Sequence, residues 1–247
     1  MENLMDESGS LTVRAAGRDW ELCRPADLES LWEALAADTP PALPHGSKGA
    51  GGREPAFVKA FEEDERLPYW VELWPASIAL SDWLHSNSAR IRGKRCLDLG
   101  CGLGLTAMVA SACGALVLAM DYEKDALDFA RLNAELNGVP QPLWTVMDWR
   151  APAVRRASLD FIWGGDIMYE RRFVTPVLDF LDYALAPDGV VWLAEPNRNV
   201  YDDFRAELLR RKRPGGRGWN SGRVYSGKVE PLHVQKAKVS VSLWELS

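Results

Sequence analysis

A glycine-rich segment between a short apolar run and an apolar helical stretch is the feature that most limits the fold. Residues 97–105 read LDLGCGLGL. In open α/β sheets ligands bind where the strands end, and glycine there lets the backbone approach a ligand closely. The GxGxxG dinucleotide pattern fails because Leu105 stands where its last glycine would be, and no GK[ST] triplet follows. The segment is typical of a ligand site with no pyrophosphate cradle, the alternative being a tight turn without a ligand.

Strands and helices alternate from residue 76 onward. Short apolar runs predict strands, and longer amphipathic or apolar segments predict helices. The predicted strands are 95–99, 116–120, 143–147, 161–165, 190–194 and a terminal antiparallel strand within 234–246. The predicted helices are 77–85, 105–113, 125–136, 175 to about 186, and 201–211. Repeated βα units with apolar strands indicate an α/β protein with a parallel sheet covered on both faces.

Acidic residues stand where the next two predicted strands end. Asp121 follows the strand 116–120, and a carboxylate at that position can accept hydrogen bonds from both ribose hydroxyls of an adenosine. Asp148 and Trp149 end the strand 143–147, where the acid could accept from an adenine amino group and the indole could contact the ring. The alternatives are a helix cap for Asp121 and, for the second pair, a core tryptophan beside a surface acid.

Composition narrows the class of protein. The chain has 247 residues and a net charge of -6, which argues mildly against bulk nucleic-acid or anionic-membrane binding. Its longest apolar stretch, 105–120, is too short to cross a bilayer, and no signal peptide is visible. Four cysteines without a CxxC pair and three scattered histidines favour reduced thiols and no metal site. We therefore expect a cytoplasmic protein without a membrane segment.

The first 67 residues differ from the rest of the chain. Apolar residues at positions 28, 31, 32 and 35 predict an amphipathic helix over 27–35. A Pro/Gly-rich stretch at 39–52 predicts a linker, and a short helix is expected at 57–63. The expected organisation is a small N-terminal helical extension, 1–67, followed by one α/β domain, 68–247.

With these features, residues 68–247 resemble the class I S-adenosylmethionine-dependent methyltransferases. Residues 72–77 (ELWPAS) and 164–169 (GGDIMY) resemble motifs of the seven-strand lysine methyltransferases, the family that includes the chaperone-lysine and electron-transfer-flavoprotein-lysine enzymes. The resemblance implies a Rossmann-like, seven-stranded, mostly parallel sheet with an antiparallel terminal strand, and S-adenosylmethionine as cofactor. The cofactor-binding residues expected on these grounds are Trp74, Asp98, Gly100, Cys101, Gly102, Gly104, Asp121, Tyr122, Asp148, Trp149 and Gly165.

The resemblance also points to Asp166 and Tyr169, after the fourth strand, as the residues that handle the acceptor. A lysine amine has a pKa near ~10.4 and must lose its proton before it can attack a methyl group. Asp166 could bind the ammonium on arrival and Tyr169 could accept a hydrogen bond from the amine; a helix cap and plain packing are the respective alternatives. Trp74 and Trp163 could supply aromatic walls for a cation. Glu195, Pro196 and Asn197, at the end of the fifth strand, are expected to shape the acceptor pocket.

Three functions follow from these features. The first is N-methylation of a lysine in a protein substrate. The second keeps the cofactor but changes the acceptor to a small molecule or nucleic acid, since residues 205–223 contain seven Lys/Arg against one Glu. A solvated helix end is the simpler reading of that basic segment, and no NPPY-type tetrapeptide follows the fourth strand, so nucleic acid is disfavoured. The third, a non-catalytic cofactor-binding module, is disfavoured by the intact glycine-rich turn with Asp121 and Asp166.

Overall fold

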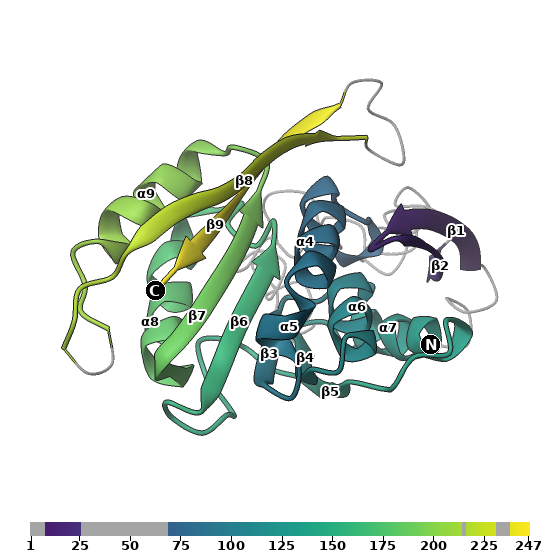
Figure 1. Ribbon diagram of the computed structural model, residues 1–247, viewed down its shortest axis with the longest axis horizontal. Coiled ribbons are helices and arrows are strands. Elements are labelled where there is room, and N and C mark those ends of the chain that lie inside the picture. The colour runs from purple at the N-terminus through teal and green to yellow at the C-terminus, as the bar shows by residue number, and fades with distance from the viewer. Residues whose placement is uncertain (1–7, 26–68, 214–215, 231–237) are drawn as a thin grey trace, which may run out of the picture.

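The computed structural model describes residues 8–25, 69–213, 216–230 and 238–247. Its centre is a seven-stranded sheet in the order β5-β4-β3-β6-β7-β9-β8 (Figure 1). The strands are β3 (Arg95–Leu99), β4 (Leu116–Asp121), β5 (Leu143–Val146), β6 (Leu159–Gly165), β7 (Leu185–Glu195), β8 (Ser221–Val229) and β9 (Val239–Leu246). The strands β3 to β7 pair in parallel, whereas β9 is antiparallel to both β7 and β8.

Helices cover both faces of this sheet (Figure 1). They are α4 (Pro75–Ser86), α5 (Ser88–Ile91), α6 (Leu105–Ala112), α7 (Lys124–Leu136), α8 (Val174–Ala184) and α9 (Asn199–Leu208), with 3-10 turns η1 (Tyr69–Val71) and η2 (Arg171–Phe173). The helices α4, α6 and α7 pack on one face, and α8 and α9 on the other. The predicted α/β class, with a mostly parallel seven-stranded sheet between helices, is confirmed.

The central strands supply both cores because their side chains alternate between the two faces. In β3, Cys96 packs toward α4 and α6 while Leu97 packs toward α8. In β6, Phe161 and Trp163 belong to the first core and Ile162 to the second. Because Trp163 is fully buried in that core, the expectation that it forms an aromatic wall of the site is wrong.

The described part of the N-terminal extension is a β-hairpin, which the sequence reading did not predict. Strand β1 (Ser8–Ala15) pairs antiparallel with β2 (Arg18–Pro25) through a tight turn in which Ala16 and Gly17 both have positive φ. Two such residues give the twist that joins hairpin strands. The predicted helices 27–35 and 57–63 and the linker 39–52 lie outside the described residues.

Buried polar contacts join this hairpin to the main domain. Asn133 of α7 accepts a 2.6 Å hydrogen bond from the Cys23 backbone and donates to the carbonyl oxygens of Cys23 and Leu103, both at 3.1 Å. At the hairpin turn, the Ala16 N–H donates to Asp82 of α4 at 2.6 Å. Because Leu103 belongs to the glycine-rich turn, Asn133 links the hairpin directly to that turn.

The C-terminal part differs from the sequence reading in two places. Strand β8 was not predicted, because its residues are mostly exposed and lack a run of buried apolar positions. It pairs with β9, so two antiparallel strands rather than one extend the sheet beyond β7. The helix expected from 175 to about 186 ends at Ala184, and Leu185 already begins β7.

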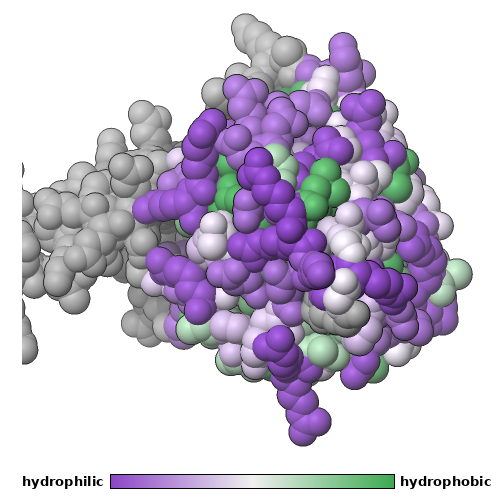
Figure 2. Space-filling view, turned by 90° about the vertical axis from the view of Figure 1, so that its left-hand side faces the viewer, coloured by the Kyte–Doolittle hydropathy of each residue, from purple (hydrophilic) through white to green (hydrophobic). Residues whose placement is uncertain are grey.

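The face that carries α8 and α9 is mainly hydrophilic (Figure 2). Arginines from the basic segment are paired locally there: Arg211 with Asp179 at 2.7 Å and Asp182 at 3.1 Å, and Arg217 with Asp188 at 2.7 Å. With Arg210, which pairs with Glu207, three of the seven Lys/Arg of this segment have an acidic partner among the described residues of the chain. Among the described residues, no helix is both long and apolar enough to cross a membrane, and no cluster of acidic, His or Cys side chains could hold a metal.

Candidate active site

The glycine-rich turn closes over the end of β4. The N–H groups of Gly100 and Cys101 donate to the carbonyl oxygen of Met120 at 3.0 and 2.9 Å, and Gly102 donates to Oδ2 of Asp121 at 2.8 Å. Gly100 and Gly102 have φ of +72° and +50°, a region that L side chains avoid. Glycine here lets the turn bend tightly and leaves its pocket side free of side chains.

Asp121 is a buried acid at the carboxyl end of β4, with 8% of its surface exposed. Its Oδ1 accepts a 3.0 Å hydrogen bond from the Glu123 N–H, so both of its oxygens are held by backbone donors. Burial raises the pKa of Asp121, and the backbone donors oppose that rise. Since each carboxylate oxygen has two lone pairs, Asp121 can still accept hydrogen bonds from a ligand.

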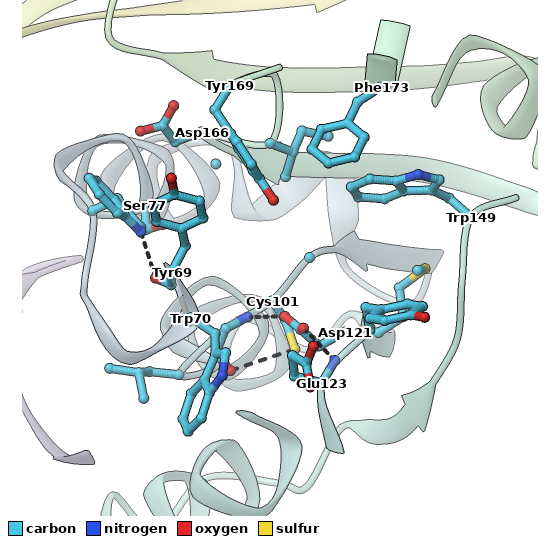
Figure 3. A pocket seen from close by; sticks show the side chains of 18 of the residues that line it. Tyr69, Trp70, Ser77, Cys101, Asp121, Glu123, Trp149, Asp166, Tyr169 and Phe173 are labelled. Carbon is cyan, nitrogen blue, oxygen red and sulfur yellow. Dashed lines mark hydrogen bonds between the residues drawn. The ribbon is translucent and has the colours of Figure 1, made fainter. Parts of the chain in front are cut away.

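A row of aromatic rings forms one wall of the pocket (Figure 3). The centroids of Trp74 and Tyr69 lie 6.2 Å apart, those of Tyr69 and Tyr169 5.1 Å, those of Tyr169 and Phe173 5.0 Å, and those of Phe173 and Trp149 5.3 Å, all edge-to-face. Trp74 also donates its indole N–H to the Tyr69 carbonyl oxygen at 2.9 Å. The row connects η1 and the start of α4 with the loop after β5 and η2.

The other side of the pocket is set by the end of β6. A Cβ on Gly165 would lie 2.9 Å from Oγ and 3.3 Å from Cα of Ser77, so only glycine fits against the start of α4. The next residue, Asp166, has φ of +56° and donates its N–H to the Ala194 carbonyl oxygen at 2.8 Å. A non-glycine residue in this region is strained, and such strain is often found at functional sites.

Asp166 is paired with a cation that no sequence pattern predicts. The Arg198 guanidinium donates from Nε to Oδ1 at 2.9 Å and from the second nitrogen to Oδ2 at 3.0 Å. Burial raises the pKa of Asp166, while the Arg198 hydrogen bonds and charge lower it. The carboxylate predicted to bind a substrate ammonium thus already has a partner from the chain itself.

Tyr169 points its ring into the pocket (Figure 3). Burial and the nearby carboxylates of Glu170 and Asp121 raise the pKa of the Tyr169 phenol well above its ordinary value. The hydroxyl therefore stays protonated at neutral pH. It can accept a hydrogen bond from an amine through its lone pairs, but it cannot serve as an anionic base there.

Most of the predicted site residues meet in one pocket. Eleven of them line it: Trp74, Gly100, Cys101, Gly102, Asp121, Tyr122, Asp148, Trp149, Gly165, Asp166 and Tyr169. Asp148 forms a 2.8 Å ion pair with Arg150, and Arg150 lines the same pocket. The pocket is also lined by residues that no sequence pattern assigns to the site, among them Tyr69, Trp70, Ser77, Thr106, Met147 and Phe173.

The structure places two predicted cofactor residues outside the pocket. Asp98 is 1% exposed and accepts a 2.6 Å hydrogen bond from the Thr106 hydroxyl, so it supports a lining residue from beneath. Gly104 has φ of +84°, and a Cβ there would lie 2.8 Å from the Cβ of Ala130. Gly104 therefore permits close packing of the turn against α7 rather than contact with a ligand.

Glu195 also lies outside the set of lining residues. It accepts hydrogen bonds from the Arg198 N–H at 2.9 Å and the Trp244 indole N–H at 3.1 Å. Burial raises the pKa of Glu195, and these donors oppose the rise. Its observed contacts hold the β7–α9 loop and β9, so the expectation that it shapes the acceptor pocket directly is not met.

The fold is that of the class I methyltransferases. The chain superposes on the T. thermophilus 16S rRNA N2 G1207 methyltransferase RsmC, in complex with AdoMet and guanosine, with a TM-score of 0.54 at 16% identity, covering 96% of this chain and 50% of that one. It superposes on the magnesium protoporphyrin IX methyltransferase ChlM from Synechocystis PCC 6803, with bound SAM, with a TM-score of 0.50 at 15% identity, covering 79% and 86%. At these identities the likeness shows the fold.

The chain belongs to the lysine methyltransferase family, whose sequence profile matches residues 59–210, more than half of its length. It is 36% identical over 152 residues to the electron transfer flavoprotein beta subunit lysine methyltransferase of Xenopus laevis, covering 60% of this chain and 59% of that protein. It is 28% identical over 172 residues to the protein N-lysine methyltransferase METTL21A of Mus musculus, covering 67% and 76%. The chain spans only 40% of the mouse electron transfer flavoprotein beta subunit lysine methyltransferase, so the match alone does not assign these relatives' substrates to this chain.

Proposed function

We propose that this protein transfers a methyl group from S-adenosylmethionine to the side-chain nitrogen of a lysine in a protein substrate. One observation carries the proposal. A single pocket joins the glycine-rich turn and Asp121 to Asp166 and Tyr169 along a continuous aromatic wall. Membership in the lysine methyltransferase family and the resemblance to METTL21A support a protein lysine as the acceptor.

The residues of the pocket fit S-adenosylmethionine. Gly100 and Gly102 leave room for a ligand beside the backbone, and Asp121 offers a buried carboxylate for the ribose hydroxyls. Trp149 follows β5 and lines the pocket at the place where we expect the adenine ring of the cofactor to bind. The aromatic wall suits a sulfonium, because the faces of aromatic rings attract cations.

At the acceptor end, the chain must present an amine with a free lone pair. When bound, S-adenosylmethionine supplies a methyl carbon activated by its sulfonium; the nitrogen–carbon bond forms as the carbon–sulfur bond breaks, and the electron pair of that bond stays on sulfur. The edge-to-face rings of Tyr69 and Tyr169 line the pocket at this end, and the protonated Tyr169 hydroxyl can orient the amine by accepting a hydrogen bond from one of its N–H groups. Alignment of this kind supplies much of the rate in such a displacement.

The observed ion pairs bear on the alternative acceptors. Arg211 and Arg217 of the basic segment are engaged by Asp179, Asp182 and Asp188, which reduces the charge available to nucleic-acid phosphates. We therefore propose a protein substrate in preference to nucleic acid. No feature of the pocket favours a specific small molecule.

We also propose that the protein works in a reducing, cytoplasmic compartment. All four cysteines, Cys23, Cys96, Cys101 and Cys113, lie in the described residues and are unpaired. Burial raises the pKa of the Cys101 thiol well above its ordinary value, so this pocket residue stays a thiol at neutral pH. Fractionation of cells followed by immunodetection of the protein would test the compartment.

The proposed activity is tested with the purified full chain, methyl-labelled S-adenosylmethionine and a cell lysate whose own methyltransferases have been heat-inactivated. We expect label on a small number of protein bands, and mass spectrometry should place the methyl group on lysine. Tyr169→Phe should lower kcat about tenfold, the worth of one hydrogen bond, while cofactor binding is retained. Tyr183→Phe, on α8 outside the pocket, is the matched control and should match the wild type. Label found only on nucleic acid or on arginine would overturn the lysine assignment.

A further inference from the structure

The ion pair between Asp166 and Arg198 is asymmetric in its exposure. The Asp166 side chain is 5% exposed and lines the pocket, whereas the Arg198 side chain is 40% exposed and comes from the loop before α9. Both guanidinium hydrogen bonds reach the same carboxylate, at 2.9 and 3.0 Å. Bidentate pairs of this kind fix both orientation and charge.

The backbone holds both partners in place. Asp166 is bound through its N–H to Ala194 at 2.8 Å and has its strained φ of +56°. Arg198 donates its own N–H to Oε2 of Glu195 at 2.9 Å and stands immediately before the first residue of α9. Neither residue can move far without breaking these contacts, so the pair is a fixed part of the acceptor end.

Among the residues that the structure describes, two further titratable groups act on the Arg198 guanidinium. Glu195 at the end of β7 and Tyr69 on η1 face Arg198. On the α4 side the neighbour of Gly165 is Ser77, which does not titrate. An unpaired Asp166 carboxylate at this position would attract a lysine ammonium and stabilise its protonated form, which cannot accept a methyl group.

We propose that Arg198 is a positioning residue for the acceptor: its guanidinium neutralises the charge of the Asp166 carboxylate that lines the pocket, so that the substrate lysine releases its proton to solvent and reacts as a neutral amine. The inference rests on the proposed lysine methylation. In this proposal Asp166 orients the acceptor while Arg198 neutralises the charge of its carboxylate. A free carboxylate would instead hold the lysine as an ammonium ion.

The first test compares the pH dependence of kcat for the wild type, Arg198→Met and Arg198→Lys, using the substrate identified by methyl labelling. In Arg198→Met the acid limb should move to higher pH by about 1 to 3 pH units, the usual effect of one close opposite charge. At a pH below the displaced limb, kcat should then fall about tenfold for each pH unit that the limb has moved, and it should recover in alkaline buffer. Arg198→Lys keeps the charge and should restore most of the wild-type profile.

The matched control is Arg210→Met, because Arg210 is an exposed arginine just beyond α9 whose ion-pair partner is Glu207. It should leave the pH profile unchanged. A merely structural role for Arg198 would lower kcat equally at every pH, and that result, or an unmoved acid limb, would overturn the inference. A wild-type protein that methylates no lysine would overturn the proposed function itself, so the two failures are distinguishable.

A second readout needs neither substrate nor cofactor. Carboxyl carbons of aspartate are labelled with ¹³C and titrated by NMR, with Asp166→Asn used to assign the signal of Asp166. The Asp166 signal should titrate at higher pH in Arg198→Met than in the wild type, by about 1 to 3 pH units. Identical titration curves in the two proteins would show that Arg198 does not control the charge of Asp166.

Discussion

The backbone N–H of Gly102 donates a 2.8 Å hydrogen bond to Oδ2 of Asp121. The turn after β3 and the acid at the end of β4 are thereby joined directly, although they are 19 residues apart. Because the carboxylate orients the turn and the turn orients the carboxylate, the proposed cofactor end of the pocket forms as one unit. A change at either residue should therefore affect the other.

Replacing Asp121 with Ala should weaken the binding of S-adenosylmethionine by about 10- to 100-fold, since hydrogen bonds to a charged group contribute about 1.5 to 3 kcal/mol each. Asp121→Asn keeps one oxygen acceptor and should have an intermediate effect. Isothermal titration calorimetry gives the Kd, and a thermal melt shows whether each variant is folded. A folded Asp121→Ala protein with the wild-type Kd would contradict the assignment.

Gly104 offers a test of packing that is separate from binding. Gly104→Ala should lower the free energy of unfolding by about 2 to 5 kcal/mol, since positive φ costs about 1 to 2 and overpacking about 1 to 3. Gly138→Ala is the control, because its φ is +61° and nothing lies within 4 Å of its added Cβ. Gly138→Ala should lose only the unfolding free energy that positive φ costs. Denaturant unfolding measures the free energy of unfolding of both variants. Equal losses in the two variants would refute the close contact with Ala130.

Much of the site could be predicted because parallel topology brings strand ends together. Strand β3 has the predicted bounds 95–99, and the ends of β3, β4 and β6 then meet at one edge of the sheet. Gly100 and Asp166 directly follow two of those ends and Asp121 is the last residue of β4, so their meeting in the pocket follows from the alternation of strands and helices.

Other features depend on tertiary contacts that no local pattern reports. Arg198 and Asp166 are 32 residues apart in the sequence, and no motif around Arg198 predicts their ion pair. The true position of Trp163 could have been predicted from strand alternation. That alternation puts Trp163 on the same face of the sheet as Phe161, in the core beneath α4 and α6. The β1–β2 hairpin also left a weak signal, since Val13 and Ala15 alternate with polar residues.

Asn133 should be the main anchor of that hairpin. Asn133→Ala removes one buried hydrogen bond to Leu103 and two part-buried ones to Cys23, and it should cost about 2 to 4 kcal/mol of unfolding free energy. Asn137→Ala, which removes the more exposed bonds to Glu21, should cost about 1 kcal/mol or less. Hydrogen exchange should show lost protection of β1 and β2 in Asn133→Ala. Unchanged protection would mean that packing alone holds the hairpin.

Asp98 should make stability depend on pH in an unusual direction. Burial raises the pKa of Asp98 to about 7, against about 3.9 in an unfolded chain. The folded state then binds more protons than the unfolded state between these values, so the contribution of Asp98 to stability falls as pH rises from about 4 to about 7. The difference in unfolding free energy between wild type and Asp98→Asn, measured by urea unfolding, should decline over that range.

Asp160→Asn supplies a control of opposite sign. The Arg95 hydrogen bonds lower the pKa of Asp160, so its contribution is present above the unfolded value of about 3.9 and is lost as pH falls below it. The difference between wild type and Asp160→Asn should therefore be flat from neutral pH down to that value and shrink in more acidic buffer. A flat Asp98 difference across the same titration would show that Asp98 keeps an ordinary pKa.

Two groups among the eleven tryptophans of this protein stand in different surroundings. Trp70, Trp74 and Trp149 line the pocket, whereas Trp163 and Trp192 are fully buried between the sheet and α4. A molecule bound in the pocket should quench or shift the emission of the first group while the second stays unchanged. Global unfolding should move the emission of the second group to longer wavelength as water reaches it. Changes in tryptophan emission should therefore report both occupancy of the pocket and unfolding without any added dye.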